Sequence, residues 1–166
     1  MEAIYLIGFM GSGKTTVSKA LAKKLEVDVY DTDMEIVKRA GMTINEIFFH
    51  KGEEQFRSLE SEVLHSMPVT DAVVATGGGI IGSEKNRGFL KGKKNVVFLQ
   101  ADFGAIMDRL KGDDTRPLLS ENKMEAAEEL YRSRLPLYQE TAKIEIDTSG
   151  KTVSMIVDEI IQRMKK

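Results

Sequence analysis

The feature that most constrains the fold is a glycine-rich segment of eight residues near the N-terminus, GFMGSGKT at 8–15. It follows a strand-like apolar run at 4–7 and leads into a helix-period segment at 14–25. The pattern G-x-x-x-x-G-K-[ST] between a strand and a helix is typical of a loop that wraps a phosphate group. A chance match in a glycine-rich turn is the alternative, and the correctly placed strand and helix argue against it.

The residue types in this phosphate-binding loop (P-loop, 8–15) suit a nucleoside triphosphate. Glycines let backbone N–H groups approach a phosphate closely, and the helix N-terminus adds partial positive charge. The Lys14 ammonium is expected to reach the β- and γ-phosphates, and the Thr15 hydroxyl to ligate Mg²⁺. The residues expected to contact ATP here are Gly11, Ser12, Gly13, Lys14, Thr15 and Thr16. The loop predicts nucleotide binding but does not identify the phosphoryl acceptor.

The rest of the chain alternates between strand-like and helix-like segments. The apolar runs of strand length are 4–7, 72–75, 96–99 and 143–146, with a weaker run at 27–30. The helix-period segments are 14–25, 43–51, 53–67, 83–90, 103–110, 123–141 and 153–164. Alternating β and α units predict one α/β domain over residues 1–166, with a parallel sheet covered by helices on both faces.

Composition excludes several kinds of site. The 166 residues contain no cysteine, so a disulfide framework, a thiolate metal site and a cysteine nucleophile are absent. His50 and His65 lack metal-binding spacing, which favours oxygen ligands and Mg²⁺ for any cation. The net charge of −2 is spread along the chain, without a basic tract for nucleic acid or a membrane surface. No leader or membrane-spanning pattern is visible, and we expect a cytoplasmic protein.

Residues 111–123 break the periodic pattern with polar and turn-forming residues. Thirteen consecutive loop residues are unusual in so small a domain, and such loops are often lids. Arg116 in this loop could cover the phosphates and neutralise charge that develops during transfer. Arg109, seven residues earlier, ends the preceding helical segment. A simple connection is the alternative interpretation of this loop.

Two carboxylates follow the predicted strand at 27–30, in the triplet Asp31-Thr32-Asp33. The carboxyl edge of an open α/β sheet is where ligands bind. If the strand continues through the triplet, Asp31 and Asp33 face the same side, where one would hold a Mg²⁺ water and the other an acceptor hydroxyl. The alternative is an acidic turn that caps the next helix.

A run of glycines, Thr76-Gly77-Gly78-Gly79, ends the predicted strand at 72–75. Many P-loop proteins carry a metal-binding aspartate at this point, and its absence makes Asp31 the better candidate for the metal's protein partner. Consecutive glycines suit a place where a ligand approaches the backbone closely. A loose turn is the alternative.

Two arginines lie in segments that contain other polar residues of interest. Arg57 shares a helix face with Glu60 and could bind a carboxylate or diol through its planar guanidinium. Alone, it would more simply pair with Glu53 four residues earlier on the surface. Arg134 stands in RLPLY at 134–138, just before a proline.

The combination of these segments resembles the shikimate kinase family over nearly the full length. The matching segments are GFMGSGKTT at 8–16, DTD at 31–33, GMTINEIFFHKGEEQFRSLE at 41–60, TGGGII at 76–81, RLKGDDTRPLL at 109–119 and RLPLY at 134–138. The stretch 147–152 departs from the pattern, because some members carry an arginine and a proline there. The resemblance implies a single-domain P-loop kinase fold with a five-stranded parallel sheet, an acceptor-binding helical segment at about 33–61 and a mobile lid at about 111–123.

The implied reaction is ATP-dependent phosphorylation of the 3-hydroxyl of shikimate to shikimate 3-phosphate, in aromatic amino-acid (chorismate) biosynthesis, with Mg²⁺. By matching position, Asp33 binds shikimate hydroxyls and acts as the base. Arg57 and Arg134 bind the carboxylate, and the backbone of Gly78 and Gly79 contacts the ring.

On the nucleotide side, the resemblance implies that Arg109 stacks on adenine and that Arg116 is the lid arginine, so that the expected catalytic set is Lys14, Asp33 and Arg116. The expected partners are shikimate and ATP, and the expected state is a monomer. A gluconate or nucleoside monophosphate kinase would keep the P-loop but need another acceptor pocket, against which Phe56-Arg57 and the glycine run argue. A non-catalytic nucleotide switch is the remaining alternative.

Overall fold

The structure of the protein, a computed structural model, describes residues 1–111 and 121–165. Five parallel strands form one sheet in the order β2-β3-β1-β4-β5. The strands are β1 (Ile4–Ile7), β2 (Asp28–Asp31), β3 (Ala72–Ala75), β4 (Asn95–Gln100) and β5 (Ile144–Asp147). The predicted single α/β domain with a five-stranded parallel sheet is thereby confirmed.

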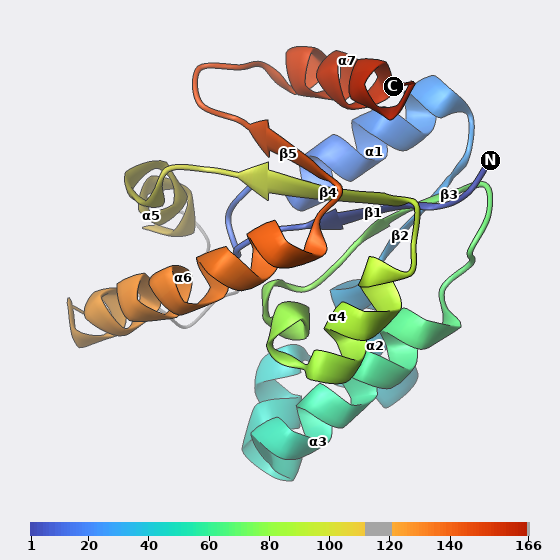
Figure 1. Cartoon of the computed structure of the whole chain (residues 1–166). Helices are drawn as coiled ribbons and strands as arrows, with labels where there is room; N and C mark the ends of the chain where they lie inside the picture. The colour runs from blue at the N-terminus through green and yellow to red at the C-terminus, as the bar shows by residue number, and fades with distance from the viewer. Residues whose placement is uncertain (112–120, 166) are drawn as a thin grey trace.

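Helices cover both faces of the sheet (Figure 1). They are α1 (Lys14–Leu25), α2 (Thr32–Ala40), α3 (Ile44–Ser66), α4 (Glu84–Lys91), α5 (Phe103–Lys111), α6 (Glu121–Thr141) and α7 (Val153–Met164), with a 3₁₀ helix, η1 (Gly78–Gly82). Helices α1 and α7 lie on one face, and α3, α4 and α6 lie on the other (Figure 1).

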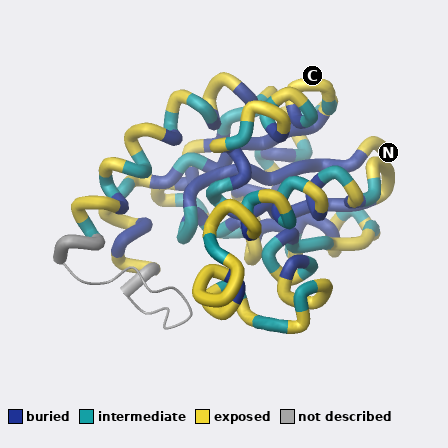
Figure 2. The backbone as a smooth tube through the Cα atoms, turned by 90° about the horizontal axis from the view of Figure 1, so that it is seen from below, coloured by how far each residue is buried: buried dark blue, intermediate teal, exposed yellow. Residues whose placement is uncertain are grey.

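Two apolar cores follow from the alternation of side chains along the central strand. Ile4 and Leu6 pack with α1 and α7, whereas Tyr5 and Ile7 pack in the core under α3, α4 and α6. All four residues are at most 1% exposed. Burial runs through the sheet, and exposed residues follow the outer sides of the helices (Figure 2). The sheet is therefore a rigid platform for the loops at its carboxyl edge.

Helix α3 begins and bends where the sequence indicates. The Thr43 hydroxyl accepts from the Glu46 N–H at 3.1 Å, and the Glu46 carboxylate accepts from the Thr43 N–H at 3.2 Å, which completes a capping box. Gly52 has φ 83° and ψ 168° inside the run. The two predicted segments, 43–51 and 53–67, are thus one helical run with a kink at a glycine.

Helix α2 is absent from the helix-period segments, although the helical segment at about 33–61 that the resemblance implies covers most of it. The helix changes how the two aspartates are placed. Asp31 ends β2 and caps α2, while Asp33 lies in the first turn of α2. The expectation that Asp31 and Asp33 alternate along an extended strand was wrong. The Asp31 carboxylate accepts from the backbone N–H groups that begin the helix, so the chain turns helical at once.

Most of the predicted lid at about 111–123, including Arg116, lies outside the described residues. Lys111 ends α5, and residues 121–123 open α6. Within residues 1–111 and 121–165, no helix combines the length and apolar character that a membrane span requires.

Candidate active site

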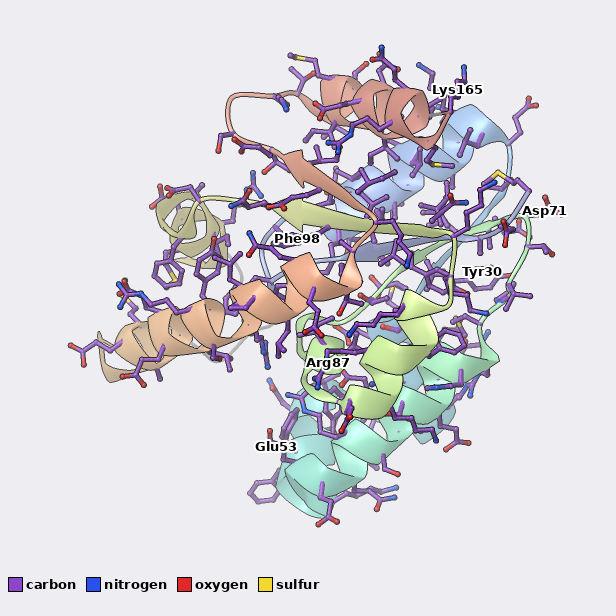
Figure 3. All side chains as sticks on the ribbon, in the orientation of Figure 1. Tyr30, Glu53, Asp71, Arg87, Phe98 and Lys165 are labelled. Carbon is purple, nitrogen blue, oxygen red and sulfur yellow. The ribbon has the colours of Figure 1, made fainter. Side chains whose placement is uncertain are left out.

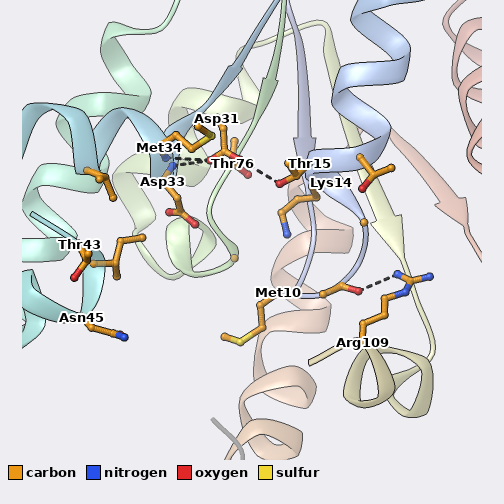
Figure 4. A pocket seen from close by; sticks show the side chains of 16 residues that line it. Met10, Lys14, Thr15, Asp31, Asp33, Met34, Thr43, Asn45, Thr76 and Arg109 are labelled. Atoms are coloured by element: carbon orange, nitrogen blue, oxygen red, sulfur yellow. Dashed lines mark hydrogen bonds between the residues drawn. The ribbon is translucent and has the colours of Figure 1, made fainter. Parts of the chain in front are cut away.

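A cavity of about 820 Å³ opens at the carboxyl edge of the sheet, between the P-loop and α2 (Figure 4). Nine of the predicted site residues line it: Gly11, Gly13, Lys14, Thr15, Thr16, Asp31, Asp33, Gly78 and Arg109. These residues, which come from four separate sequence segments, therefore line one contiguous space.

The P-loop holds its own lysine. The Lys14 ammonium donates to the carbonyls of Gly8 at 2.5 Å and Phe9 at 2.8 Å, and its side chain is largely buried. Gly13 has φ 96°, a conformation that side-chain-bearing residues rarely adopt, and it caps α1 without a side-chain bond. The first N–H groups of α1 therefore point into the cavity without a capping side chain, which suits an anionic phosphate.

Asp31 connects the two sides of the cavity. One carboxylate oxygen accepts from the Thr15 hydroxyl at 3.1 Å. The other accepts from the backbone N–H groups of Asp33 at 2.9 Å and Met34 at 3.2 Å (Figure 4). The helix-cap interpretation of Asp31 is correct for Oδ1, and the other oxygen, Oδ2, faces Thr15.

The oxygens of Thr15 and Asp31 fit a hard cation. Mg²⁺ prefers oxygen ligands and is usually held by one or two protein oxygens together with phosphate and water. In the described part of the chain, no group of three or more His, Asp or Glu residues could hold a metal by itself. The donor set therefore suits a cation that arrives with a nucleotide rather than one held by the protein alone.

Asp33 lies against the glycine run. A Cβ atom on Gly77 would fall 2.6 Å from a carboxylate oxygen of Asp33 and 3.0 Å from an oxygen of Glu60. Only a glycine leaves room for both carboxylates there. The position of Asp33 in the first turn of α2 also favours its negative charge.

Arg57 pairs mainly with Glu60 rather than with Glu53. Its guanidinium lies 2.9 Å from Glu60, whose side chain is 3% exposed, and 3.7 Å from Glu53, whose side chain is 70% exposed. Burial raises the pKa of Glu60, the nearby Arg57 opposes this rise, and the negative charge of Asp33 adds to it. A Cβ atom on Gly79 would collide with the Arg57 guanidinium, so the glycine run also makes room for this arginine.

Arg134 brings a second guanidinium to the same place. The residue is 9% exposed, and its Nη1 has no hydrogen-bond partner among the described residues. Its guanidinium carbon lies 5.7 Å from the ring centre of Phe9, a P-loop residue. Burial lowers the pKa of Arg134. A buried cation with an open donor is costly to fold, and an anionic ligand would complete it.

We call Asp33, Arg57, Glu60 and Arg134 the acceptor cluster, because the charges of the other three all act on Glu60. Arg57 and Arg134 of this cluster do not line the large cavity. Two other predicted site residues, Ser12 and Gly79, do not line it either. The cluster adjoins the cavity through Asp33 and Gly78, which do line it.

Arg109 donates to the Gly11 carbonyl at 2.9 Å and lines the cavity at the P-loop. Its predicted stacking on adenine stays a prediction, and Arg116 lies outside the described residues.

Several residues of the site received no role in the sequence interpretation. Glu60 stood on the face of Arg57, and its burial is the feature that the sequence does not display. Thr32 accepts from the Gly77 N–H at 2.9 Å, and Tyr138 donates to the Gly78 carbonyl at 2.6 Å. Tyr138 follows Arg134 by four residues, so helical spacing alone could have placed both on one face.

Known proteins give a consistent comparison. The shikimate kinase family model matches residues 10–165. A shikimate kinase of Bacillus cytotoxicus is 44% identical over 164 residues, which is 99% of each chain. The structure of the Acinetobacter baumannii shikimate kinase in complex with shikimate has a TM-score of 0.94 and 38% identity, covering 99% of this chain and 93% of that one. That of the Aquifex aeolicus enzyme has a TM-score of 0.87 and 36% identity, covering 98% and 96%. The chain therefore belongs to the shikimate kinase family.

Proposed function

We propose that the protein transfers the γ-phosphoryl group of ATP to the 3-hydroxyl of shikimate and so makes shikimate 3-phosphate for aromatic amino-acid biosynthesis. The observation that carries the proposal is the buried Arg134, whose Nη1 has an open donor beside the Arg57–Glu60 pair. A small acceptor with a carboxylate and several hydroxyls matches a site with two guanidiniums at one end and a carboxylate, Asp33, at the other.

Acceptor binding divides between charge and hydroxyl recognition. Arg57 and Arg134 bind the shikimate carboxylate through charge-assisted hydrogen bonds. Asp33 accepts from the 3-hydroxyl and takes its proton as the oxygen attacks the γ-phosphorus. The backbone at Gly78 and Gly79 lies against the ring, because glycines leave no Cβ in the way.

The P-loop binds the nucleotide. N–H groups from Gly11 to Thr16 surround the phosphates, and the Lys14 ammonium turns from loop carbonyls to the β- and γ-phosphates. The Thr15 hydroxyl and the Asp31 carboxylate hold Mg²⁺, which neutralises phosphate charge when bound.

Two arginines complete the nucleotide side. Arg109 leaves the Gly11 carbonyl to stack on adenine, and Arg116 covers the γ-phosphate from the lid at about 111–123. Removing water from the transferring group by such a closure is a general device of kinases. We place the protein in the cytoplasm, where ATP is supplied. We propose that the protein acts as a monomer.

A coupled assay of ADP release tests the function. The purified protein is incubated with ATP and Mg²⁺ and, in separate reactions, shikimate, gluconate, CMP or AMP. We expect ADP release to depend strongly on shikimate alone, and ³¹P and ¹H NMR of the product to place the phosphate on the 3-oxygen. Equal release with gluconate or a nucleoside monophosphate, or the same slow hydrolysis with every acceptor, would contradict the proposal.

A further inference from the structure

Tyr138 is a buried tyrosine outside the proposed set of substrate contacts. The residue is 1% exposed, and its hydroxyl donates to the Gly78 carbonyl at 2.6 Å. Its ring stacks on Phe98 of β4, with ring centres 5.0 Å apart and planes 19° apart. Phe98 is labelled beside β4 in Figure 3. Burial raises the pKa of Tyr138, so that the hydroxyl keeps its proton and acts as a donor.

The hydrogen bond from the Tyr138 hydroxyl to the Gly78 carbonyl fixes the direction of the Gly78–Gly79 peptide group. The Gly78 carbonyl and the Gly79 N–H belong to the same peptide plane, and no cis peptide occurs in the described chain. In a trans peptide these two groups point in opposite directions. The hydroxyl of Tyr138 therefore aims the Gly79 N–H away from itself.

The Gly79 N–H has no helical partner to fix it in any other way. The first hydrogen bond of η1 runs from the Ile80 N–H to the Gly77 carbonyl at 3.2 Å, so the N–H groups before Ile80 precede the helical pattern. Glycines also have the least intrinsic backbone preference. The orientation of this peptide thus depends on side chains that hold it from outside.

Two side chains from different helices, α2 and α6, bond to the backbone of the glycine run. Thr32 at the start of α2 accepts from the Gly77 N–H, and Tyr138 on α6 donates to the Gly78 carbonyl. Arg134 lies one turn before Tyr138 on the same helix. The hydroxyl of Tyr138 therefore ties the helix that carries the carboxylate-binding arginine to the glycines that lie beside Arg57.

We propose that Tyr138 is a positioning residue for the acceptor: its hydroxyl fixes the Gly78–Gly79 peptide and the place of Arg134 relative to it. The proposal rests on the proposed function, because the acceptor it positions is shikimate. Tyr138 itself does not touch the acceptor, and its loss should weaken acceptor binding far more than nucleotide binding.

Tyr138→Phe tests the proposal, with two matched tyrosines as controls. Tyr131 lies on the same helix, and its hydroxyl donates to the Ala101 carbonyl at 3.0 Å, away from the glycines. Tyr5 is also 1% exposed, and its hydroxyl has no partner among the described residues. Tyr138→Phe and Tyr131→Phe each remove one hydrogen bond to a backbone carbonyl, and Tyr138→Phe also removes the interaction of its hydroxyl with the Arg134 guanidinium. Tyr5→Phe removes no hydrogen bond among the described residues.

Steady-state kinetics with shikimate and ATP varied separately give the decisive readout. We expect Tyr138→Phe to raise the shikimate KM about tenfold, in line with a lost bond to a buried carbonyl, and to leave the ATP KM within about twofold. Tyr131→Phe should lower the melting temperature about as much as Tyr138→Phe does, but leave both KM values unchanged. Tyr5→Phe should change neither the KM values nor the melting temperature. An unchanged shikimate KM in Tyr138→Phe, or an equal rise in Tyr131→Phe, would overturn the proposal.

A second measurement separates this proposal from the proposed function. Spectra of ¹⁵N-glycine-labelled protein report the 14 glycine amides directly. The Gly78 and Gly79 signals should shift in Tyr138→Phe and stay in place in Tyr131→Phe. If the wild-type protein shows no shikimate-dependent ADP release, the proposed function is wrong. If the Gly78 and Gly79 signals do not move in Tyr138→Phe, the positioning role is wrong. If Tyr138→Phe does not fold, Thr32→Val removes the other anchor and should give the same selective rise in the shikimate KM; an unchanged KM would reject the mechanism.

Discussion

The P-loop and the acceptor cluster lie side by side, yet they treat their charges in opposite ways. The Lys14 ammonium is satisfied by loop carbonyls at 2.5 and 2.8 Å. In the acceptor cluster, Nη1 of the buried Arg134 has no partner among the described residues, and the buried Glu60 has a raised pKa. The lysine of the P-loop has its partners within the loop, whereas an arginine of the acceptor cluster keeps an open donor.

The difference follows from how each region is built. A P-loop is made of backbone groups: its carbonyls accept from its own lysine, and its N–H groups can donate to a phosphate. The acceptor cluster is made of side chains from α2, α3 and α6, and Nη1 of its buried Arg134 has no hydrogen-bond partner among the described residues. Burying this unpaired donor therefore lowers the stability of the free protein, and a ligand that supplies a negative charge there would relieve the cost.

The largest effect should come from Lys14→Met, which removes the charge aimed at the transferring phosphoryl group. We expect kcat to fall by about 10³–10⁵-fold, as for other preorganised charges at a phosphoryl transfer. The melting temperature should also fall slightly, because the Gly8 and Phe9 carbonyls lose their donor. The coupled assay and thermal unfolding measure both, with the exposed Lys19→Met as the control. Near-normal turnover would refute the assignment of the P-loop.

Asp33→Asn should be next, with kcat reduced by about 10²–10⁴-fold and a much smaller change in the shikimate KM. Asparagine keeps the size of the side chain and can still bond the hydroxyl, but it cannot take its proton. Asp28→Asn on the exposed end of β2 is a control for loss of one carboxylate. Wild-type turnover in Asp33→Asn would mean that another group is the base.

Arg134→Met tests whether the acceptor cluster is incomplete. Methionine fills most of the volume without a charge. We expect the shikimate KM to rise by the equivalent of about 2–4 kcal/mol, with the ATP KM close to normal. The melting temperature should rise, because a buried cation with an open donor is removed. A fall in stability would show that Arg134 is already satisfied.

Arg57→Ala sharpens the same comparison from the other arginine. It should raise the shikimate KM by a similar amount, again without a change in the ATP KM. Stability should fall rather than rise, because Glu60 at 3% exposure loses its cation. A shift in the ATP KM alone would exclude Arg57 from the acceptor site. Equal stability changes in Arg57→Ala and Arg134→Met would remove the distinction between the two arginines.

The sequence predicts the fold and the P-loop well because both depend on local patterns. Strand and helix periods, the capping box at Thr43 and the break at Gly52 each reflect contacts within a few residues. Helix α2 was missing from the helix-period segments, and only the resemblance implied it, because the strand-like run before it gives no signal of where the chain turns helical. That turn is decided by the Asp31 carboxylate, whose bonds to the Asp33 and Met34 N–H groups start the helix.

The acceptor cluster is less visible in the sequence, for a physical reason. Arg57 and Arg134 were identified through the family resemblance, since each alone has the pattern of a surface charge. The burial of Glu60 and the bond from Tyr138 to Gly78 depend on how α3 and α6 pack against the glycine run. Tertiary packing of this kind has no local sequence signature.

Glu60→Gln should have the smallest effect and the most informative pH dependence. Burial raises the pKa of Glu60 above its usual value of 4.5, although Arg57 opposes the rise. The folded protein therefore holds this proton more tightly than the unfolded chain. Stability falls as pH rises from 4.5, the usual pKa, to the raised pKa of Glu60 in the folded protein. Glutamine carries no such penalty and can still bond Arg57.

We expect Glu60→Gln to unfold at a higher temperature than the wild type at pH 8. The difference should shrink as pH falls toward 4.5 and disappear below it, because the wild-type carboxyl is then protonated in both the folded and the unfolded state. The shikimate KM should rise only a few-fold, since Arg57 keeps a hydrogen-bond acceptor. Glu53→Gln is the matched control, because its side chain is 70% exposed and faces the same arginine. If Glu60→Gln is less stable than the wild type at every pH, the ion pair with Arg57 outweighs the burial of the carboxylate, and the acceptor cluster is better compensated than the open donor of Arg134 indicates.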